Sequence, residues 1–590
     1  TLGNTAAVFG SSLTSITLPD NLDRIGAEAF KGTSLVSISI PASVTSIGKN
    51  AFFQVKTLTS VVFQPYVGEG VAPALVLEDN RSSNMPTDSQ GVFAQTGLTT
   101  IEIPARMTSI GARAFEQIPT LTSVTFEDAA NGKLTDIKAG AFRGTGLTEF
   151  VVPETVVALG EEYVHSSNKA HTATYVQTMR KYGVFLDCTA LTSLTLSSRM
   201  TQFWWSNVVG CTSLEEILVA DGSENFTSVD GVLFNSDGTR LICYPTGKAG
   251  ESYTVPEGTL NIETRAFAEA VNLRTVNISK TVTYLGYGVF QKSMVTDVIF
   301  EDGGTEDITF DATAPGGSTS SNYNATMFGW SALERVHLPA RLTRMPNFFF
   351  EGCKSLTSVE FEENSKLQEI GNAAFRYCSA LETFVMPDSV TTLVGTTGLF
   401  LDCTSLKNIT LSANLKTIGQ YMFKNCPVET VEIPESVETI EQYAFQNSGI
   451  KSIVIPATLT KFGNTGLNEF LNCAQLERVE IYAPIGNNLT YLNTSYFSGC
   501  ASLKEVILPA NIIRLGNTAF KDCISLESID LSNIKEIGNN TFEGCTSLAS
   551  VDLRSVNTIG SYAFKGCTAL TEVYTVSYTH LRAHETTLHL

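Results

Sequence analysis

The sequence predicts a repeat solenoid, built from leucine-rich repeats of about 22–23 residues and rich in β-structure, in which a ladder of parallel strands is joined by short turns or 3-10 segments. Three observations predict this fold class. A phenylalanine returns at a step of about 22 residues, a Leu-x-x-Ile-x-Ile segment follows it, and Pro or Gly closes each half of the unit. Such self-similarity means that each coil buries its apolar face only against its neighbours.

The repeat is clearest near the C-terminus, where Phe520, Phe542 and Phe564 each start a segment Phe-x-x-Cys-x-x-Leu. A ring at this position is expected to point inward and fill its coil. The whole chain holds about twenty such coils. The other phenylalanines at this position are Phe30, Phe52, Phe93, Phe115, Phe142, Phe185, Phe267, Phe290, Phe350, Phe375, Phe400, Phe423, Phe445, Phe470 and Phe497.

The Leu-x-x-Ile-x-Ile segment, as in Leu35, Ile38 and Ile40, predicts a short strand that pairs in parallel with the same strand of the next coil. Its Leu and Ile residues face the core and its x residues face outward, because successive side chains of a strand point to opposite sides. The Pro that often follows, such as Pro41, cannot donate a ladder hydrogen bond and ends the strand. A later Gly, such as Gly48, is expected at a tight turn with positive φ.

These residues carry a family resemblance. The motif Leu-x-x-Ile-x-Ile-Pro-x-x-Val-x-x-Ile-Gly-x-x-Ala-Phe-x-x-Cys resembles the BspA-like, or treponemal, class of leucine-rich repeats, and its copies cover most of residues 1–574. The match is clearest over 11–30, 350–375 and 400–573. The resemblance implies surface proteins of bacteria and some protists, which are often linked to adhesion to host or matrix proteins.

A single solenoid is expected over residues 1–574. Polar stretches rich in Ser, Asn, Gly and Thr interrupt the repeat, and we expect them to project from the coil edges as loops. These inserts lie near 64–92, 161–183 and 301–326.

A further insert, near 225–256, differs from the others. Two apolar runs flank Asp237-Gly238, which predicts an inserted β-hairpin. The tail, 575–590, abandons the repeat and resembles a translation of sequencing-adaptor DNA, so we expect the natural chain to continue differently beyond residue 574. The start at Thr1 already fits the repeat, so a missing leader says nothing about secretion.

Eleven of the twelve cysteines share one repeat position, three residues after the Phe position. Other coils place Thr33 or Ser293 there, so the position favours a small side chain with a weak donor, in a buried ladder that contacts backbone groups. Zinc ligands cluster within about two to four residues, and these cysteines do not, so no metal site is expected. Adjacent coils would place the Cα atoms about 5 Å apart, within disulfide reach. Reduced structural thiols are our main expectation, and disulfides are the alternative.

No catalytic motif stands out. The sequence has no Gly-x-Ser-x-Gly elbow, no phosphate-binding loop that ends in Gly-Lys-Ser/Thr and no His-Glu-x-x-His, and its carboxylates are spread evenly. We therefore expect no enzyme, no catalytic residues and no cofactor.

The acidic composition of the chain limits the classes of partner that it is expected to bind. The 59 Asp and Glu residues outnumber the 39 Lys and Arg residues, which gives a formal net charge of −20. An acidic chain repels phosphates, so nucleic acid is not an expected partner. No apolar run reaches about 18 residues, so no segment is expected to insert into a membrane. The resemblance implies an extracellular or cell-surface location and a protein ligand from a host, a matrix or a neighbouring cell.

The stacked strands should form one extended surface, the usual recognition face of a solenoid. Its outward positions are mostly Thr and Ser in the first coils and acids in the later ones. Either the face is merely solvated, and its charge blocks edge aggregation, or an acidic stripe meets a basic protein patch. The adjacent Trp204 and Trp205, in an irregular coil, are a second candidate, as an aromatic anchor. The acidic candidates are Glu360, Glu432, Glu480, Asp530 and Asp552.

Together these features predict a cell-surface or secreted, adhesin-like protein that binds a protein ligand. The alternative is a structural cell-coat scaffold without a specific ligand. A more distant alternative is the non-catalytic part of a larger enzyme.

Overall fold

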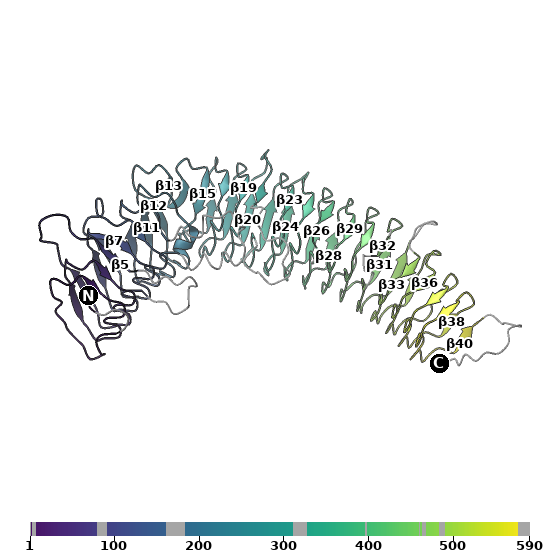
Figure 1. Cartoon of the computed structure of the whole chain (residues 1–590). Helices are drawn as coiled ribbons and strands as arrows, with labels where there is room; N and C mark the ends of the chain where they lie inside the picture. Colours follow the sequence, from purple (N-terminus) through teal and green to yellow (C-terminus); the bar gives the residue numbers. More distant parts are fainter. Residues whose placement is uncertain are drawn as a thin grey trace. The chain divides into compact units, whose positions relative to one another are not determined.

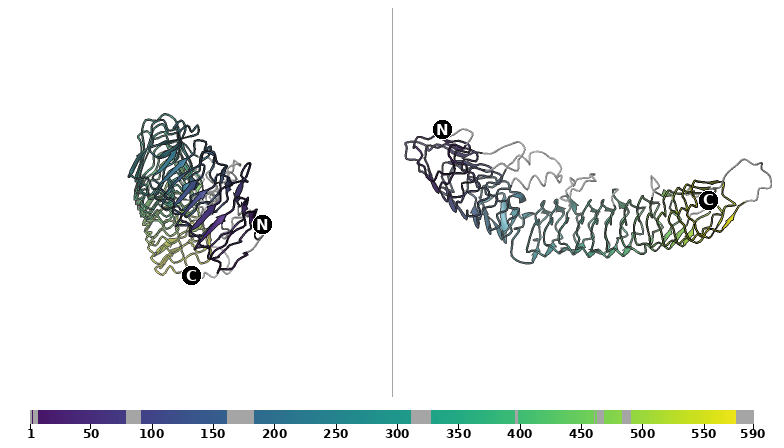
Figure 2. Two further views of the ribbon diagram at one scale, coloured as in Figure 1. Left: turned by 90° about the vertical axis from the view of Figure 1, so that its left-hand side faces the viewer. Right: turned by 90° about the horizontal axis from the view of Figure 1, so that it is seen from below.

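The computed structural model describes residues 2, 7–78, 91–160, 183–310, 327–395, 398–459, 461–462, 468–482 and 490–575 (Figure 1). The chain divides into two compact units, an N-terminal unit (Thr1–Val295 with Thr309–Met327) and a C-terminal unit (Thr296–Ile308 with Phe328–Leu590). Each is a stack of coils, and the right-hand view of Figure 2 shows those of the C-terminal unit as successive rungs in green and yellow. The tail from residue 576 lies outside the described residues, and the single solenoid over 1–574 stays a prediction.

The predicted strands form a first ladder, which confirms the fold class. β2 pairs with β4 in parallel, with Ile38 opposite Val61. Ile38 and Ile40 are buried while Ser37 and Ser39 are exposed, so the predicted alternation holds. In the N-terminal unit this ladder comprises β2 (Ser37–Ile40), β4 (Ser60–Phe63), β6 (Thr100–Ile103), β8 (Ser123–Phe126), β10 (Glu149–Val151), β11 (Ser193–Leu196), β12 (Glu216–Val219), β16 (Ser252–Thr254) and β18 (Thr275–Ile278). In the C-terminal unit it comprises β20 (Asp297–Phe300), β22 (Arg335–Leu338), β24 (Ser358–Phe361), β26 (Thr383–Val385), β28 (Asn408–Thr410), β31 (Ser452–Ile455), β33 (Arg478–Ile481), β35 (Glu505–Ile507), β38 (Ser550–Asp552) and β40 (Glu572–Tyr574).

A second parallel ladder follows the Pro-x-x-Val-x-x-Ile half of each coil. Its strands have mostly two residues, such as β1 and β3, in which Ile25 lies opposite Ile47. In the N-terminal unit they are β1 (Arg24–Ile25), β3 (Ser46–Ile47), β5 (Leu75–Leu77), β7 (Met107–Ile110), β9 (Asp136–Ile137), β17 (Asn261–Ile262), β19 (Tyr284–Leu285) and β21 (Thr309–Phe310). In the C-terminal unit they are β23 (Arg344–Met345), β25 (Glu369–Ile370), β27 (Thr392–Leu393), β29 (Thr417–Ile418), β30 (Thr439–Ile440), β32 (Lys461–Phe462), β34 (Tyr491–Leu492), β36 (Arg514–Leu515), β37 (Glu536–Ile537) and β39 (Thr558–Ile559).

The predicted phenylalanines stack into an interior spine between the two ladders. The rings of Phe30 and Phe52 lie 5.1 Å apart, centroid to centroid, with their planes 10° from parallel. Phe520 and Phe542 stack at 5.4 Å and 4°. All four residues are fully buried. Burying such a large side chain in most coils supplies much of the apolar area that holds the stack together.

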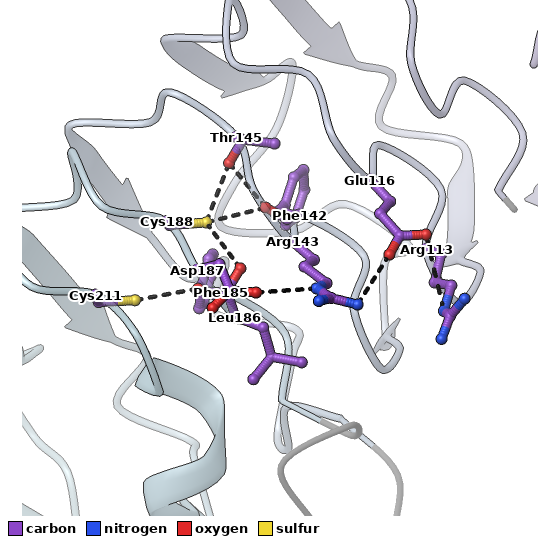
Figure 3. Close-up of polar contacts among 10 residues, drawn as sticks. All are labelled: Arg113, Glu116, Phe142, Arg143, Thr145, Phe185, Leu186, Asp187, Cys188 and Cys211. Carbon is purple, nitrogen blue, oxygen red and sulfur yellow. Dashed lines mark hydrogen bonds and ion pairs between the residues drawn. The ribbon is translucent and has the colours of Figure 1, made fainter. Parts of the chain in front are cut away.

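The cysteines connect adjacent coils. The Cys188 thiol donates to the main-chain carbonyl oxygen of Phe142 at 3.0 Å, and the Cys211 thiol donates to that of Phe185 at 3.1 Å (Figure 3). Thr145, at the equivalent position, donates to the Phe142 carbonyl of its own coil at 2.8 Å, because a hydroxyl reaches less far than a thiol. The same bond to the preceding coil is made by Cys353, Cys378, Cys403, Cys426, Cys473, Cys500, Cys523, Cys545 and Cys567.

Ion pairs also cross between coils at this turn. Arg143 contacts Glu116 at 3.4 Å and Asp187 at 3.1 Å, so it links the coils on either side of residues 161–182 (Figure 3). Glu116 is nearly buried, and that burial raises the pKa of its carboxyl, although the neighbouring arginines oppose the rise.

The glycines at the predicted tight turn have a different role. Neither Gly48 nor Gly286 has a positive φ. A Cβ on Gly48 would lie 2.5 Å from the nitrogen of Ala27, and one on Gly286 would lie 2.3 Å from the nitrogen of Thr264. The prediction of positive φ is therefore wrong at these positions: glycine is needed because the preceding coil approaches too closely for a side chain.

Left-handed backbone occurs elsewhere in the coil, two residues before and two residues after the spine phenylalanine. Asn50 (φ 58°) and Gln54 (φ 60°) flank Phe52 in this way, and the same positions around Phe423 are also left-handed. Non-glycine residues seldom adopt this conformation, and here the main chain at the corner bonds the next coil, since the N–H of Gln54 donates to the carbonyl oxygen of Ala94 at 3.1 Å.

Two of the predicted inserts belong partly to the coil. Within 64–92, β5 joins the second ladder, and Leu75 and Leu77 are fully buried. Within 301–326, β21 pairs with β19 in parallel. The expectation of projecting loops is therefore wrong for the parts of these two inserts that form β5 and β21. In β5, the two leucines point into the core. The structure does not describe residues 79–90, 161–182 and 311–326 of these inserts.

A buried arginine follows each of these two inserts. Arg106 donates to the carbonyl oxygens of Val44 at 2.7 Å and Pro41 at 3.3 Å. Arg341, at the equivalent position of its coil, donates to the carbonyl of Glu306 at 3.0 Å. The long guanidinium side chain reaches backbone groups across the enlarged turn, which a shorter side chain could not do.

The fourth insert is a small antiparallel sheet. β14 (Val232–Asn235) pairs antiparallel with β15 (Arg240–Cys243) around the expected turn at Asp237-Gly238. β13 (Phe226–Val229) also pairs antiparallel with β14, through a second turn that the sequence analysis did not identify. β15 then pairs in parallel with β17, which joins the insert to the second ladder.

Candidate ligand-binding face

The middle residue of each Ile-x-Ile segment faces outward from the first ladder, and where neighbouring strands pair, these residues stack in register. His337 lies opposite Glu360, and Val385 lies opposite Thr410. We call the set in the C-terminal unit the outward row; Figure 1 labels several of its strands, from β24 to β40. Its members are Ile299, His337, Glu360, Val385, Thr410, Glu432, Val454, Glu480, Ile507, Asp530, Asp552 and Tyr574.

All five predicted acids belong to the outward row, but they do not form an unbroken stripe. Asp530 and Asp552 are the two that occupy successive coils. Exposed apolar side chains fill most of the gaps: Val385 is 63% exposed, Val454 48% and Ile507 37%. The row therefore alternates acids with aliphatic side chains, a feature that reasoning from charge alone had missed.

Arginines of the same coil neutralise two of the five acids. Arg478 contacts Glu480 at 2.8 Å, and hydrogen bonds from Tyr482 and Arg478 lower the pKa of the Glu480 carboxyl. Arg554 holds Asp552 through its guanidinium and its main-chain N–H, which lowers the pKa of Asp552 to about 2. Both carboxylates are charged at neutral pH and lie beside an arginine, and Arg478 also contacts Glu505 at 2.8 Å.

The other three acids are less compensated. Glu360 is 72% exposed, and its nearest basic group is the His337 ring, at 4.0 Å. Glu432 and Asp530 are exposed, and none of the ion pairs among the described residues includes either of them. Asp530 accepts the N–H of Ser532 at 2.9 Å, which holds its side chain at the start of a turn.

A neighbouring row, directly before the strands of the first ladder, nearly cancels its own charge. The residue directly after the first Leu position alternates between acid and lysine along seven coils. Lys451 contacts Glu429 at 2.7 Å, and Lys504 contacts Glu477 at 3.3 Å, each across one coil boundary. Opposite charges on adjacent strands stabilise a sheet modestly. The seven residues are Glu382, Lys407, Glu429, Lys451, Glu477, Lys504 and Glu527.

The aromatic candidate lies in the N-terminal unit. Trp205 begins the 3-10 helix η2 (Trp205–Val208), and Trp204 precedes it in extended conformation. Both indoles are half-buried. The guanidinium of Arg265, which is 3% exposed, lies 4.4 Å from the Trp205 ring centroid. One face of Trp205 is therefore used inside the unit, and the role of the pair as an aromatic anchor stays a prediction.

Within the described ranges, no group of three or more His, Cys, Asp or Glu side chains is arranged to hold a metal ion. None of the helices described is long and apolar enough to cross a membrane.

The comparison with known families fits this geometry. The model for the BspA type leucine-rich repeat region matches residues 4–69, 87–215, 130–238, 246–312, 321–451, 395–488 and 465–583. The chain belongs to the BspA-type leucine-rich-repeat family. This confirms the resemblance and the fold class that the sequence predicted. BspA-type repeats are generally non-catalytic.

Solved structures of bacterial leucine-rich-repeat proteins are similar to this BspA-type chain. One from Eubacterium ventriosum is 21% identical and covers 71% of this chain and 84% of its own, with a TM-score of 0.43. One from Bacteroides ovatus is 20% identical and covers 80% of this chain and 86% of its own, with a TM-score of 0.38. A leucine-rich cell surface protein from Faecalibacterium prausnitzii is 19% identical and covers 82% of this chain and 90% of its own, with a TM-score of 0.26. No curated protein matches the chain.

Proposed function

We propose that this chain is a cell-surface or secreted, adhesin-like protein, which binds a protein ligand through the outward row and acts by binding and not by catalysis. One observation carries the proposal: the outward row mixes exposed aliphatic side chains with acids, three of which have no lysine or arginine partner among the described residues, while the row beside it nearly cancels its own charge. A face that served solubility alone would not need exposed Val385, Val454 and Ile507 among its acids.

This combination suits protein recognition. Exposed acids attract a basic surface and raise the rate of encounter. The aliphatic side chains between them then gain free energy when they leave water. The net charge of −20 argues against nucleic acid as the partner. The family is typically associated with cell surfaces, which supports an extracellular location.

A scaffold role is the second candidate, because one observation favours it. The ion pairs of the neighbouring row, such as Lys504 with Glu477, join successive coils. Charges on this face therefore also stabilise the stack, as a cell-coat spacer without a ligand would require.

A variant of the outward row with fewer charges distinguishes the binding role from the scaffold role. The triple substitution Glu360→Gln, Glu432→Gln and Asp530→Asn removes the three less compensated acids. Binding of the wild type and the variant to a panel of immobilised extracellular matrix proteins is measured at low and at moderate salt. We expect the variant to lose about tenfold in affinity at low salt, with a smaller difference as screening increases.

The matched control neutralises three acids in or directly before strands of the second ladder. Glu369, Glu438 and Glu536 pair with Arg344, Lys416 and Arg514. Their replacement by Gln changes the net charge by the same amount on other strands, and affinity should stay within about twofold of the wild type. A wild type that binds nothing in the panel, or equal losses in both variants, would favour the scaffold.

A further inference from the structure

A groove opens in the C-terminal unit beside Glu360. It has a volume of about 660 Å³, within the range of ligand-binding clefts. The groove lies between the end of β24, the turn that follows it and the end of β26. Its lining combines apolar side chains, from Val359, Phe361, Val385 and Pro387, with carboxylates, from Glu360, Glu362 and Asp388.

The groove exists because one turn is longer than its neighbour. Phe361 and Leu367, the apolar residues on either side of the turn after β24, are six positions apart, whereas Leu338 and Leu342 in the preceding coil are four apart. Asn364, with a φ of 59°, reverses the chain within the long turn. Asn364 and its neighbour Ser365 line the groove as one wall.

The groove carries a surplus of negative charge. Among the described residues, the one basic group that contacts Glu360 is the His337 ring, and that ring already contacts Asp302 at 2.9 Å. Asp388 accepts the N–H of Ala413 at 3.0 Å, a neutral group that does not cancel its charge.

Glu362 is partly compensated. Its carboxylate accepts the N–H of Ala340 at 2.8 Å, and the buried guanidinium of Arg341 attracts it. None of the ion pairs in the described part of the chain gives Glu360 or Asp388 a lysine or arginine partner. A positive group would therefore be drawn to the side of the groove that these two carboxylates form.

An apolar floor beside a negative rim matches the two parts of a lysine or arginine side chain. The methylene stem of such a side chain packs on apolar surface while its charged head stays at the edge. Val385, which is 63% exposed, offers that surface one coil away from Glu360. A purely apolar occupant would remove the carboxylates from water without a partner, which costs free energy, and an acidic occupant would be repelled.

We propose that this groove anchors a lysine or arginine of the protein ligand, next to an aliphatic residue of the same segment. The inference rests on the proposed function, because it names the part of the ligand that the outward row would hold most firmly. A few side chains that fill pockets at an interface, arginine among them, often carry a large share of the binding energy.

The test uses a labelled, end-capped peptide of alternating lysine and valine, titrated with the chain and followed by fluorescence anisotropy. Val385→Lys places a cation in the groove, and Val454→Lys makes the same change on the outward row outside it. We expect Val385→Lys to weaken peptide binding about tenfold and Val454→Lys to change it less than about twofold. A peptide of alternating glutamate and valine should not bind. Circular dichroism and thermal unfolding establish that both variants fold.

Equal effects of the two substitutions, or equal binding of the two peptides, would overturn the groove assignment. The proposed function can be contradicted independently of the groove assignment. If the outward-row triple variant loses its matrix ligand while Val385→Lys binds both ligand and peptide as the wild type does, the function stands and the groove assignment falls. If no matrix protein binds but the lysine peptide still depends on Val385, the function falls and the groove assignment stands.

Discussion

The thiol of Cys523 donates a hydrogen bond to the main-chain carbonyl oxygen of Phe497, in the preceding coil, at 3.2 Å. Both residues are fully buried. The same carbonyl accepts the N–H of Cys500 at 3.1 Å, so it serves its own turn and the next coil together. Repeated along the chain, this bond helps to fix how each coil sits on the one before it.

Replacing that thiol should weaken the stack. We expect Cys523→Ala to lower the free energy of unfolding by about 1–2 kcal/mol, because it removes the hydrogen bond and leaves a small cavity. Cys523→Ser should lower the free energy of unfolding by less, because the serine hydroxyl can donate to the main-chain carbonyl of its own coil, as Ser293 donates to that of Phe290 at 2.8 Å. Urea unfolding followed by circular dichroism compares the two. Equal losses would show that the hydrogen bond contributes nothing measurable.

The cysteines should differ in reactivity along the ladder. Cys567 is half-buried, and burial raises the pKa of its thiol to about 11, whereas Cys353 is fully buried with a pKa of about 12. Because the thiolate is the reactive form, a thiol reagent at pH 8 should label Cys567 first and the buried thiols far more slowly. Mass spectrometry after denaturation without reductant should then find twelve labelled cysteines. A clearly smaller number would indicate disulfides.

Glu469 is an ionisable group inside the solenoid. It precedes the spine residue Phe470, at a position where the adjoining coils have Ala444 and Tyr496, and it is fully buried. None of the ion pairs among the described residues includes it. Burial raises the pKa of its carboxyl from 4.5 to about 8.

The sign of the resulting pH dependence follows from proton binding. Between about pH 4.5 and 8 the folded chain keeps a proton that the unfolded chain has released, so the free energy of unfolding falls as pH rises through this window. The slope is at most about 1.4 kcal/mol per pH unit. Glu469→Met, which copies Met422 at the same position of another coil, should remove the slope and raise the melting temperature at pH 8. A variant that keeps the slope would assign it to other groups.

The sequence predicted the first ladder because four-residue strands such as β2 show the alternation of buried and exposed residues directly. The second ladder went unnoticed because strands such as β1 have two residues, too few to show a period. The glycine prediction failed for a related reason: the close approach of Gly48 to Ala27 lies between coils, and local sequence carries no sign of it.

The candidate face was predicted in position but not in its charge balance. The spacing placed Glu360 and Glu480 on one row, and the structure agrees. Which acids have a basic partner could not be predicted from the sequence, because it depends on which residues of adjacent coils lie side by side. Lys451 contacts Glu429 at a separation of 22 residues, whereas Arg478 contacts Glu505 at a separation of 27. Turns of unequal length set these offsets. The groove beside Glu360 arises from one such turn, and it escaped the sequence analysis for that reason.

A matched pair of single substitutions tests the central claim, that the outward row binds the protein ligand. Thr410 on β28 and Thr392 on β27 are both exposed, but Thr410 belongs to the outward row and Thr392 to the second ladder. The measurement is the affinity for a matrix protein that the wild type binds, at low salt, for Thr410→Arg and for Thr392→Arg. We predict that Thr410→Arg lowers the affinity about tenfold, because its cation enters the acidic row. Thr392→Arg should change the affinity less than about twofold. Equal affinities, or a larger loss for Thr392→Arg, would contradict the claim.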